Sequence, residues 1–297
     1  MAHNHHHHSV DSRNSNMLMA VLLNLFITGI EFAGGMFSNS LALITDAMHN
    51  LSDSITILAS YFAIKIGKRK STFSGTFGYK RVEILTAFIN SSILLIICVY
   101  IFIVGCRRLL HPETVSSSLM LVISGIALLA NLSAVFLIKK DSSHNLNIRT
   151  AYLHLLGDVF SSLALIVGSI LIYFFHIHWI DPLLTILISA FIFKELIPVL
   201  IQSINILLQI SPKEMDIEKI KNDILNIQEI KDIHHIHIWN LSENDIYFEG
   251  HLKFNQDIQL SQADAIRKQA ERILIEQYHI AHVTLQVEFD ICNETKH

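Results

Sequence analysis

Two short patterns in apolar surroundings carry residue types that bind transition metals. Each places a His and an Asp four residues apart: His49 with Asp53, and His154 with Asp158. On a helix, side chains at this spacing project from one face, one turn apart. Two such helices facing each other would offer two imidazole nitrogens and two carboxylate oxygens. This ligand set suits a tetrahedral divalent metal such as zinc.

A single His-x-x-x-Asp pattern is weak, because in a soluble helix it is more often a surface pair or a helix cap. Two copies in apolar helices are more informative, since ionisable groups within a membrane are costly and persist mainly where they have a partner and a function. Asp46 lies one turn before His49. We predict that Asp46 accepts a hydrogen bond near the metal rather than binding it.

The composition indicates a protein that lies mostly within a membrane. Of the 297 residues, 51% are hydrophobic and only 16% are charged, which is too little polar surface to cover a soluble fold. The net charge of −4, without a basic stripe, excludes nucleic acid as a partner. The three cysteines show no spacing typical of a disulfide framework.

Six apolar segments follow a polar, His-rich tail at residues 1–16 and predict a transmembrane domain at 17–210. The segments are 17–37, 41–66, 77–104, 119–138, 151–175 and 179–208. Lys and Arg gather in the second-to-third and fourth-to-fifth loops, so the positive-inside rule predicts that both termini are cytoplasmic. We interpret the tail as a native metal-rich segment, with a purification tag as the alternative.

The character of the chain changes after residue 210, where charges become frequent. Apolar spacing predicts a helix, two strands, a helix and a strand, at 215–227, 233–239, 246–254, 263–277 and 283–289. Residues 211–297 are therefore expected to form a small cytoplasmic α+β domain of order αββαβ. Because so small a domain has a thin core, we expect a second copy or metal to stabilise it.

Further motifs occur in order along this frame. They are Ser40-Leu41-Ala42-Leu43, the sequence Phe-Gly-Tyr-Lys-Arg-Val-Glu at 77–83, Asp181-Pro182, and His-His-Ile-His-Ile-Trp at 234–239. With the two His-Asp pairs, they make the chain resemble the cation diffusion facilitator family, in its zinc-transporting branch, and bacterial cobalt-zinc-cadmium resistance proteins. The resemblance covers nearly the whole chain beyond the tail. It implies a homodimeric, proton-coupled exporter of divalent metal in the lipid bilayer, not an enzyme, with a metallochaperone-like cytoplasmic domain.

The resemblance also implies residue roles. The transport-site ligands it implies are His49, Asp53, His154 and Asp158. For the cytoplasmic domain it implies a possible regulatory zinc site of His234, His251 and Glu288. Some members carry another metal site in the loop after the second helix. Because residues 65–77 contain neither Asp nor His, we expect no metal there.

Strand alternation and the resemblance disagree about the cytoplasmic site. Alternation places His235 and His237 on one face of a strand and His234 on the other, whereas the resemblance favours His234 as a ligand. His282 shares a predicted strand face with Glu288 and is a further candidate. The alternative is that these are surface histidines without metal.

Charge predicts how the membrane site would work. With neutral imidazoles and ionised carboxylates it carries two negative charges, which one divalent cation neutralises. An empty, unprotonated site would be costly, so metal and protons should exclude one another, as antiport requires. Since free His has a pKa of about 6.5 and Asp of about 3.9, His49 or His154 is predicted to carry the exchanged proton.

Other functions fit the sequence less well. A membrane metalloenzyme is disfavoured, because His-Glu-x-x-His is absent and four protein ligands leave no open position for a reactive water. A metal sensor or an uncoupled channel is a third class. Cadmium, cobalt or iron are further candidate substrates beside zinc. The compact loops favour a bacterial inner membrane.

Overall fold

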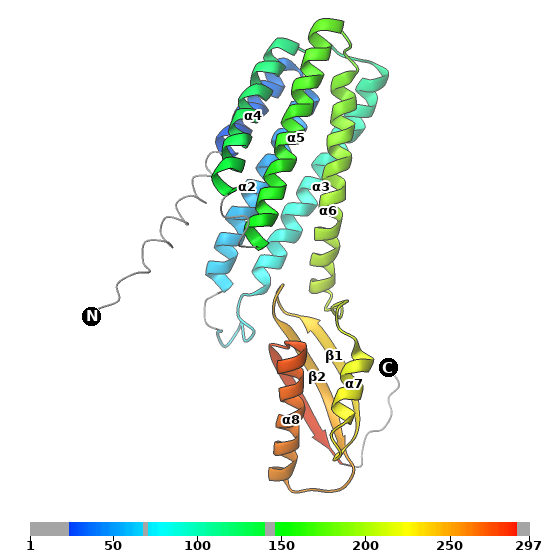
Figure 1. Cartoon of the computed structure of the whole chain (residues 1–297). Helices are drawn as coiled ribbons and strands as arrows, with labels where there is room; N and C mark the ends of the chain where they lie inside the picture. Colours follow the sequence, from blue (N-terminus) through cyan, green and yellow to red (C-terminus); the bar gives the residue numbers. More distant parts are fainter. Residues whose placement is uncertain (1–23, 68–70, 140–145, 290–297) are drawn as a thin grey trace, which may run out of the picture. The chain divides into compact units, whose positions relative to one another are not determined.

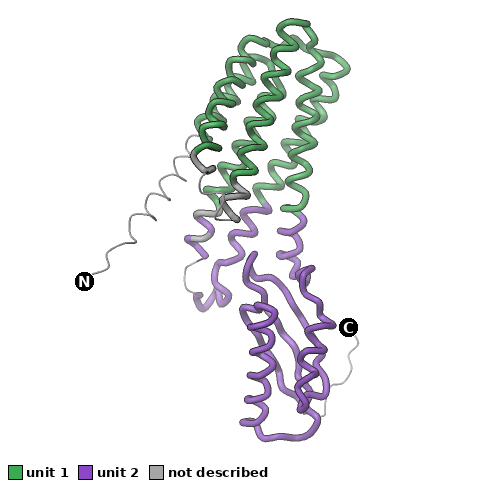
Figure 2. The backbone as a smooth tube through the Cα atoms, viewed as in Figure 1, with its two compact units in different colours: residues 1–61, 89–200 green, residues 62–88, 201–297 purple. Residues whose placement is uncertain are grey.

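The computed structural model describes residues 24–67, 71–139 and 146–289, as long helices followed by a small α+β domain (Figure 1). The chain divides into two compact units, residues 1–61 with 89–200 and residues 62–88 with 201–297 (Figure 2). The His-rich tail predicted at 1–16 lies outside the described residues. The predicted boundary between 210 and 211 stays a prediction.

Long helices make up the first unit, and three of them extend into residues of the second. They are a helix described over residues 24–38, α2 (Leu41–Gly67), α3 (Arg81–Leu110), α4 (Ser117–Lys139), α5 (Leu146–Phe175) and α6 (Ile180–Leu207). Among the described helices, four are long and apolar enough to cross a membrane, namely α3 to α6. α2 carries Asp46, His49 and Asp53 and is less apolar. The count of six spans therefore remains a prediction.

The start of α2 is fixed by a buried carboxylate from α6. Asp181 accepts hydrogen bonds from the Ser40 hydroxyl at 2.5 Å and from the backbone N–H groups of Leu41 and Ala42 at 3.0 and 3.4 Å. The first N–H groups of a helix have no partner within it, and a negative charge there is favourable. Asp181 therefore aligns the first turns of α2 and α6, which run in the same direction (Figure 1).

The small domain follows the predicted order. It consists of α7 (Ile217–Leu225), β1 (Ile230–Asn240), β2 (Ile246–Phe254), α8 (Leu260–Tyr278) and β3 (His282–Glu288). β2 is central, antiparallel to β1 and parallel to β3. Both helices contribute to one core with the sheet, which includes Ile224, Phe248, Leu252 and Leu274. The predicted fold class, a helical membrane protein with a small α+β domain, is confirmed.

The turn between β1 and β2 is fastened by Asp245. Its carboxylate accepts a hydrogen bond from the Ser242 hydroxyl at 2.5 Å and from the Lys80 ammonium at 2.9 Å. Partial burial acts to raise the pKa of Asp245, but these hydrogen bonds and the charge of Lys80 outweigh it and hold the pKa below its ordinary value. The turn is thus tied to the residue that precedes α3.

Candidate metal centre

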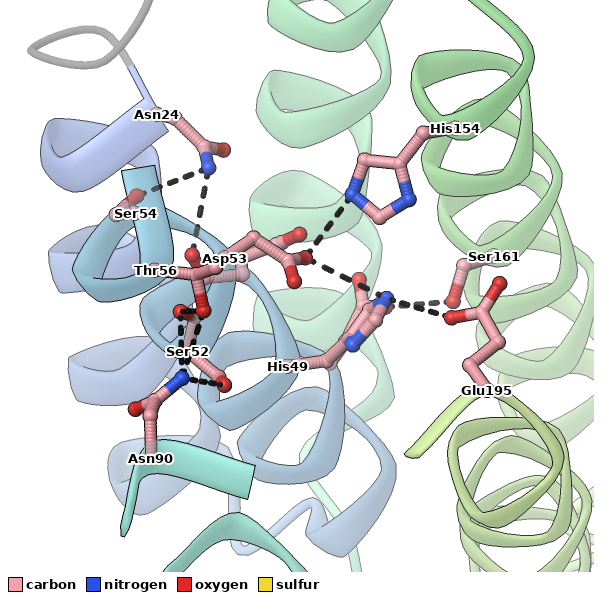
Figure 3. Close-up of polar contacts among 12 residues, drawn as sticks. Asn24, His49, Ser52, Asp53, Ser54, Thr56, Asn90, His154, Ser161 and Glu195 are labelled. Carbon is pink, nitrogen blue, oxygen red and sulfur yellow. Dashed lines mark hydrogen bonds and ion pairs between the residues drawn. The ribbon is translucent and has the colours of Figure 1, made fainter. Parts of the chain in front are cut away.

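Three of the predicted ligands in the first unit converge (Figure 3). The Oδ2 atom of Asp53 lies 3.6 Å from Nε2 of His49 and 3.1 Å from Nε2 of His154. One ligand atom from each residue lies within 4.8 Å of the other two. Tetrahedral zinc with bonds of about 2.0–2.1 Å would separate its ligands by about 3.3 Å. The two distances from Asp53 bracket that value, so its carboxylate is placed to share one zinc ion with either imidazole.

The fourth predicted ligand, Asp158, lies one turn beyond His154 on α5. It is buried, with 6% of the residue exposed, and interacts electrostatically with His49 and His154. It is not part of the group of three within 4.8 Å. The structure therefore places Asp158 next to the cluster, and metal binding by all four residues stays a prediction.

The neighbouring carboxylates are held by polar partners. Ser161 on α5 donates a hydrogen bond to Oδ1 of Asp46 at 2.5 Å, which links α5 to α2. Asn50 on α2 donates to Oε2 of the fully buried Glu31 at 2.9 Å. This arrangement agrees with the prediction that Asp46 accepts a hydrogen bond near the cluster.

Amide side chains from two further helices hold the same part of α2. Asn24 donates to Ser54 Oγ at 3.0 Å, and Asn90 on α3 donates to Ser52 Oγ at 3.0 Å (Figure 3). Ser52 and Ser54 flank Asp53 in the sequence. Because the flanking hydroxyls are hydrogen-bonded to neighbouring helices, the rotation of α2 is restrained and Asp53 is kept directed at the two imidazoles.

A carboxylate that the sequence analysis did not single out also faces this cluster. Glu195 lies on α6, and its Oε2 atom is 3.8 Å from Nε2 of His49 (Figure 3). The signal was present in the sequence, because Lys194 and Glu195 interrupt an otherwise apolar segment. A search for His-Asp pairs at helical spacing does not detect it.

The predicted cytoplasmic ligands also come together. Nδ1 of His251 lies 2.7 Å from Oε1 of Glu288, and Nε2 of His234 lies 3.4 Å from Oε2 of Glu288. His234 and His251 are paired residues of β1 and β2, and Glu288 lies on β3, which is bonded to the other edge of β2. Three adjacent strands therefore supply one ligand each. Metal binding by this cluster stays a prediction.

A β-bulge explains why strand alternation was wrong for His234. The register of β1 against β2 shifts between His234 and His237, and His235 has a φ of 50°. The His235 ring lies 5.4 Å from that of His234 and 5.0 Å from that of His251, so the two neighbouring histidines do not point to opposite faces. His282 instead contacts Tyr247, at the opposite end of β3 from Glu288.

Several buried atoms of the cytoplasmic cluster lack a hydrogen bond within the described chain. They are both ring nitrogens of His234, Nδ1 of His251 and Oε2 of Glu288. The short distance from His251 to Glu288 does not have hydrogen-bond geometry. Buried polar atoms are normally paired, so converging lone pairs without hydrogen bonds fit a site for a divalent cation.

Comparisons with known proteins identify two family domains in the chain. Residues 17–208 match the cation efflux transmembrane domain, and residues 212–290 match the cytoplasmic domain of cation efflux proteins. A cadmium, cobalt and zinc/H(+)-K(+) antiporter of Bacillus velezensis is 36% identical, over 97% of this chain and 92% of that protein. The zinc transporter ZitB of Pectobacterium atrosepticum is 34% identical, over 99% and 91%. The metal cation efflux system protein CzcD of Cupriavidus metallidurans is 30% identical, over 98% and 91%.

Proposed function

The chain belongs to the cation efflux family, and we propose that it is a proton-coupled antiporter that exports divalent metal cations, chiefly Zn²⁺, from the cytoplasm. Membership makes it an integral membrane protein and a metal transporter, not an enzyme. The relatives are named for zinc, cadmium and cobalt, so Cd²⁺ and Co²⁺ are proposed as further substrates.

The observation that carries the proposal is the convergence of His49, Asp53 and His154 from two helices of the membrane unit. We propose that Asp158 completes the tetrahedral site, because one turn of α5 separates it from His154. Two imidazoles and two carboxylates give a mixed nitrogen and oxygen set, which suits zinc better than a hard cation such as Mg²⁺.

Proton coupling follows from competition at the same atoms. Imidazole and carboxylate bind metal only when deprotonated, so binding releases protons and protonation releases metal. One side of the membrane would favour the protonated site and the other the metal-bound site. Opening the site to each side in turn then exchanges protons for zinc. Asp53 lies 3.1 Å from His154 and 3.6 Å from His49. Protons and metal would therefore compete for the same nitrogen and oxygen atoms.

The remaining assignments concern topology and control. We propose six spans with both termini cytoplasmic, in a bacterial inner membrane, because the relatives are bacterial proteins. The match to the cytoplasmic domain of cation efflux proteins supports a homodimer. Zinc at His234, His251 and Glu288 would favour one arrangement of that domain and so regulate transport through a population shift.

The test is zinc uptake into proteoliposomes with an imposed pH gradient and equal potassium on both sides. The native chain is compared with Asp158→Ala and with Asp257→Ala, which removes an exposed carboxylate. Uptake should follow the gradient, fall by at least about a hundredfold in Asp158→Ala, and persist in Asp257→Ala. Uptake that does not depend on the pH gradient would overturn proton coupling. Uptake that persists in Asp158→Ala would overturn the proposed four-ligand transport site.

A further inference from the structure

Glu195 belongs neither to the two His-Asp pairs nor to the predicted ligand set, yet it lies beside the cluster of His49, Asp53 and His154. Its carboxylate is directed at His49 across the space between α6 and α2 (Figure 3). The distance of 3.8 Å from Oε2 to Nε2 of His49 is close to the separation of about 3.3 Å expected between two ligands of one zinc ion. Glu195 does not belong to the group of three residues whose ligand atoms lie within 4.8 Å of one another. It therefore approaches that group from one side.

Helix geometry indicates from which side Glu195 approaches. α2 and α6 start together, because Asp181 caps the first turn of α2, and both run in the same direction. At a rise of about 1.5 Å per residue, His49 lies about 12 Å and Glu195 about 21 Å from that common start. The Glu195 backbone is therefore nearer the other end, which is cytoplasmic in the proposed topology. Helical side chains tilt toward the amino terminus, so its carboxylate reaches back to His49.

Exposure separates Glu195 from His49, which its carboxylate faces. The side chains of Glu195 and His154 are 41% and 38% exposed, compared with 25% for Asp53 and 10% for His49. Lipid tails cannot solvate a carboxylate, so an exposed Glu directed into the helix bundle implies that water reaches it there. A hydrated cation approaching from the cytoplasmic end would therefore meet Glu195 before His49.

We propose that Glu195 is a loading ligand, which binds the incoming divalent metal together with His49 and then releases it to the proposed four-ligand site. The inference deepens the proposed function and rests on it. Tetrahedral zinc cannot retain Glu195 in addition to two imidazoles and two aspartates. The bond from the metal to the Glu195 oxygen therefore breaks as the bond to the Asp158 oxygen forms. One carboxylate replaces another, so the charge of the metal complex is unchanged.

The experiment measures initial zinc uptake into proteoliposomes over a range of zinc concentrations, for the native chain, Glu195→Gln, Glu195→Asp and Lys194→Gln. Gln keeps the size of the side chain but removes its charge, and Lys194 is the exposed neighbour on the same helix. In Glu195→Gln the half-saturating zinc concentration should rise about tenfold, because the protein no longer has a negative charge there to attract the approaching cation. The maximal rate should stay within about twofold, and equilibrium zinc affinity, measured by calorimetry, within about threefold. Glu195→Asp should restore part of the loss, and Lys194→Gln should match the native chain.

Three results would overturn the loading role. These are an unchanged half-saturating concentration in Glu195→Gln, an equal rise in Lys194→Gln, or a fall in equilibrium affinity as large as the kinetic effect, which would make Glu195 a permanent ligand. Asp53→Asn is measured in parallel to separate this inference from the proposed function. Transport that survives Asp53→Asn would reject the membrane site itself, whereas loss in Asp53→Asn with a native curve for Glu195→Gln rejects only the loading ligand.

Discussion

Two clusters each combine two histidines with one carboxylate: the membrane cluster of His49, Asp53 and His154, and the cytoplasmic cluster of His234, His251 and Glu288. Different kinds of structure hold them. His49 and His154 lie on separate helices, α2 and α5, whose relative position depends on side-chain contacts. His234 and His251 are paired residues of adjacent strands. Helices can shift or tilt against one another as rigid elements, whereas strands of one sheet are fixed by backbone hydrogen bonds. The first arrangement suits an ion in transit, and the second suits a resident ion.

The two clusters also differ in their surroundings. Near the membrane cluster, further carboxylates belong to Asp46, Asp158 and Glu195, on three different helices. Near the cytoplasmic cluster, within the described residues, the additional carboxylate is that of Asp232, 3.3 Å from Nδ1 of His234. Several alternative oxygens let a metal exchange ligands in steps, whereas a single set gives one stable position. Ligand identity alone would therefore not distinguish the proposed transport site from the proposed regulatory site.

One substitution in each cluster tests this comparison and should change transport the most. His154→Ala should lower zinc transport by at least about a hundredfold, since even residues that only support a metal ligand cost 10–100-fold in affinity or activity. His234→Ala should leave transport at saturating zinc within about threefold, because the role proposed for this residue is regulatory. Uptake into proteoliposomes measures both. Equal losses in the two variants would break the comparison.

An intermediate effect concerns stability. Zinc at about 100 times its dissociation constant should stabilise the folded cytoplasmic domain by about 2.7 kcal/mol. Amides of β2 and β3 that exchange through opening of the domain should then exchange about a hundredfold more slowly. Hydrogen exchange of the full chain, followed by mass spectrometry with and without zinc, measures this.

Glu288→Gln and Asp53→Asn are the matched variants for this measurement. Glu288→Gln removes the carboxylate shared by His234 and His251, so zinc should no longer slow exchange in the sheet. Asp53→Asn changes only the membrane cluster and should keep the native protection. Protection that persists in Glu288→Gln would mean that the strands do not hold a resident ion.

Local patterns predicted most of the fold. The limits of β2 agree with the prediction, because period-two alternation is uninterrupted from Ile246 to Phe254. α7 is shorter than predicted and starts at Ile217, because Asp216 caps it by accepting a hydrogen bond from the Lys219 N–H. Apolar periodicity alone does not show at which residue a cap starts the helix.

The sequence predicted the candidate sites only where the site residues are close together along the chain. The pairs His49 with Asp53 and His154 with Asp158 are visible because helical spacing puts them on one face. The approach of Glu195 depends on how α6 packs against α2, and no sequence period encodes that. The bulge at His235 requires a positive φ at a non-glycine residue, which strand propensity does not predict.

The smallest expected effect concerns the turn beside the sheet, where Asp245 meets Lys80. Asp245→Asn should lower the free energy of unfolding of the cytoplasmic domain by less than about 1 kcal/mol at pH 7, because both side chains are partly exposed. The folded-state pKa of Asp245 is lowered. Its contribution is therefore complete above the unfolded pKa of about 3.9 and is lost as the pH falls through the lower folded value.

Fluorescence of Trp239 during thermal unfolding reports on the cytoplasmic domain once Trp179→Phe has removed the other tryptophan of the chain. Native and Asp245→Asn chains should differ at pH 7, and the difference should shrink as the pH falls below about 3.9. Lys80→Met should reproduce the loss at pH 7, since it removes the other half of the ion pair. A difference that stays constant as the pH falls would mean that Asp245 acts through the shape of the turn rather than its charge. Zinc should stabilise native and variant domains equally, because the paired strands, and not this turn, hold the ligands in place.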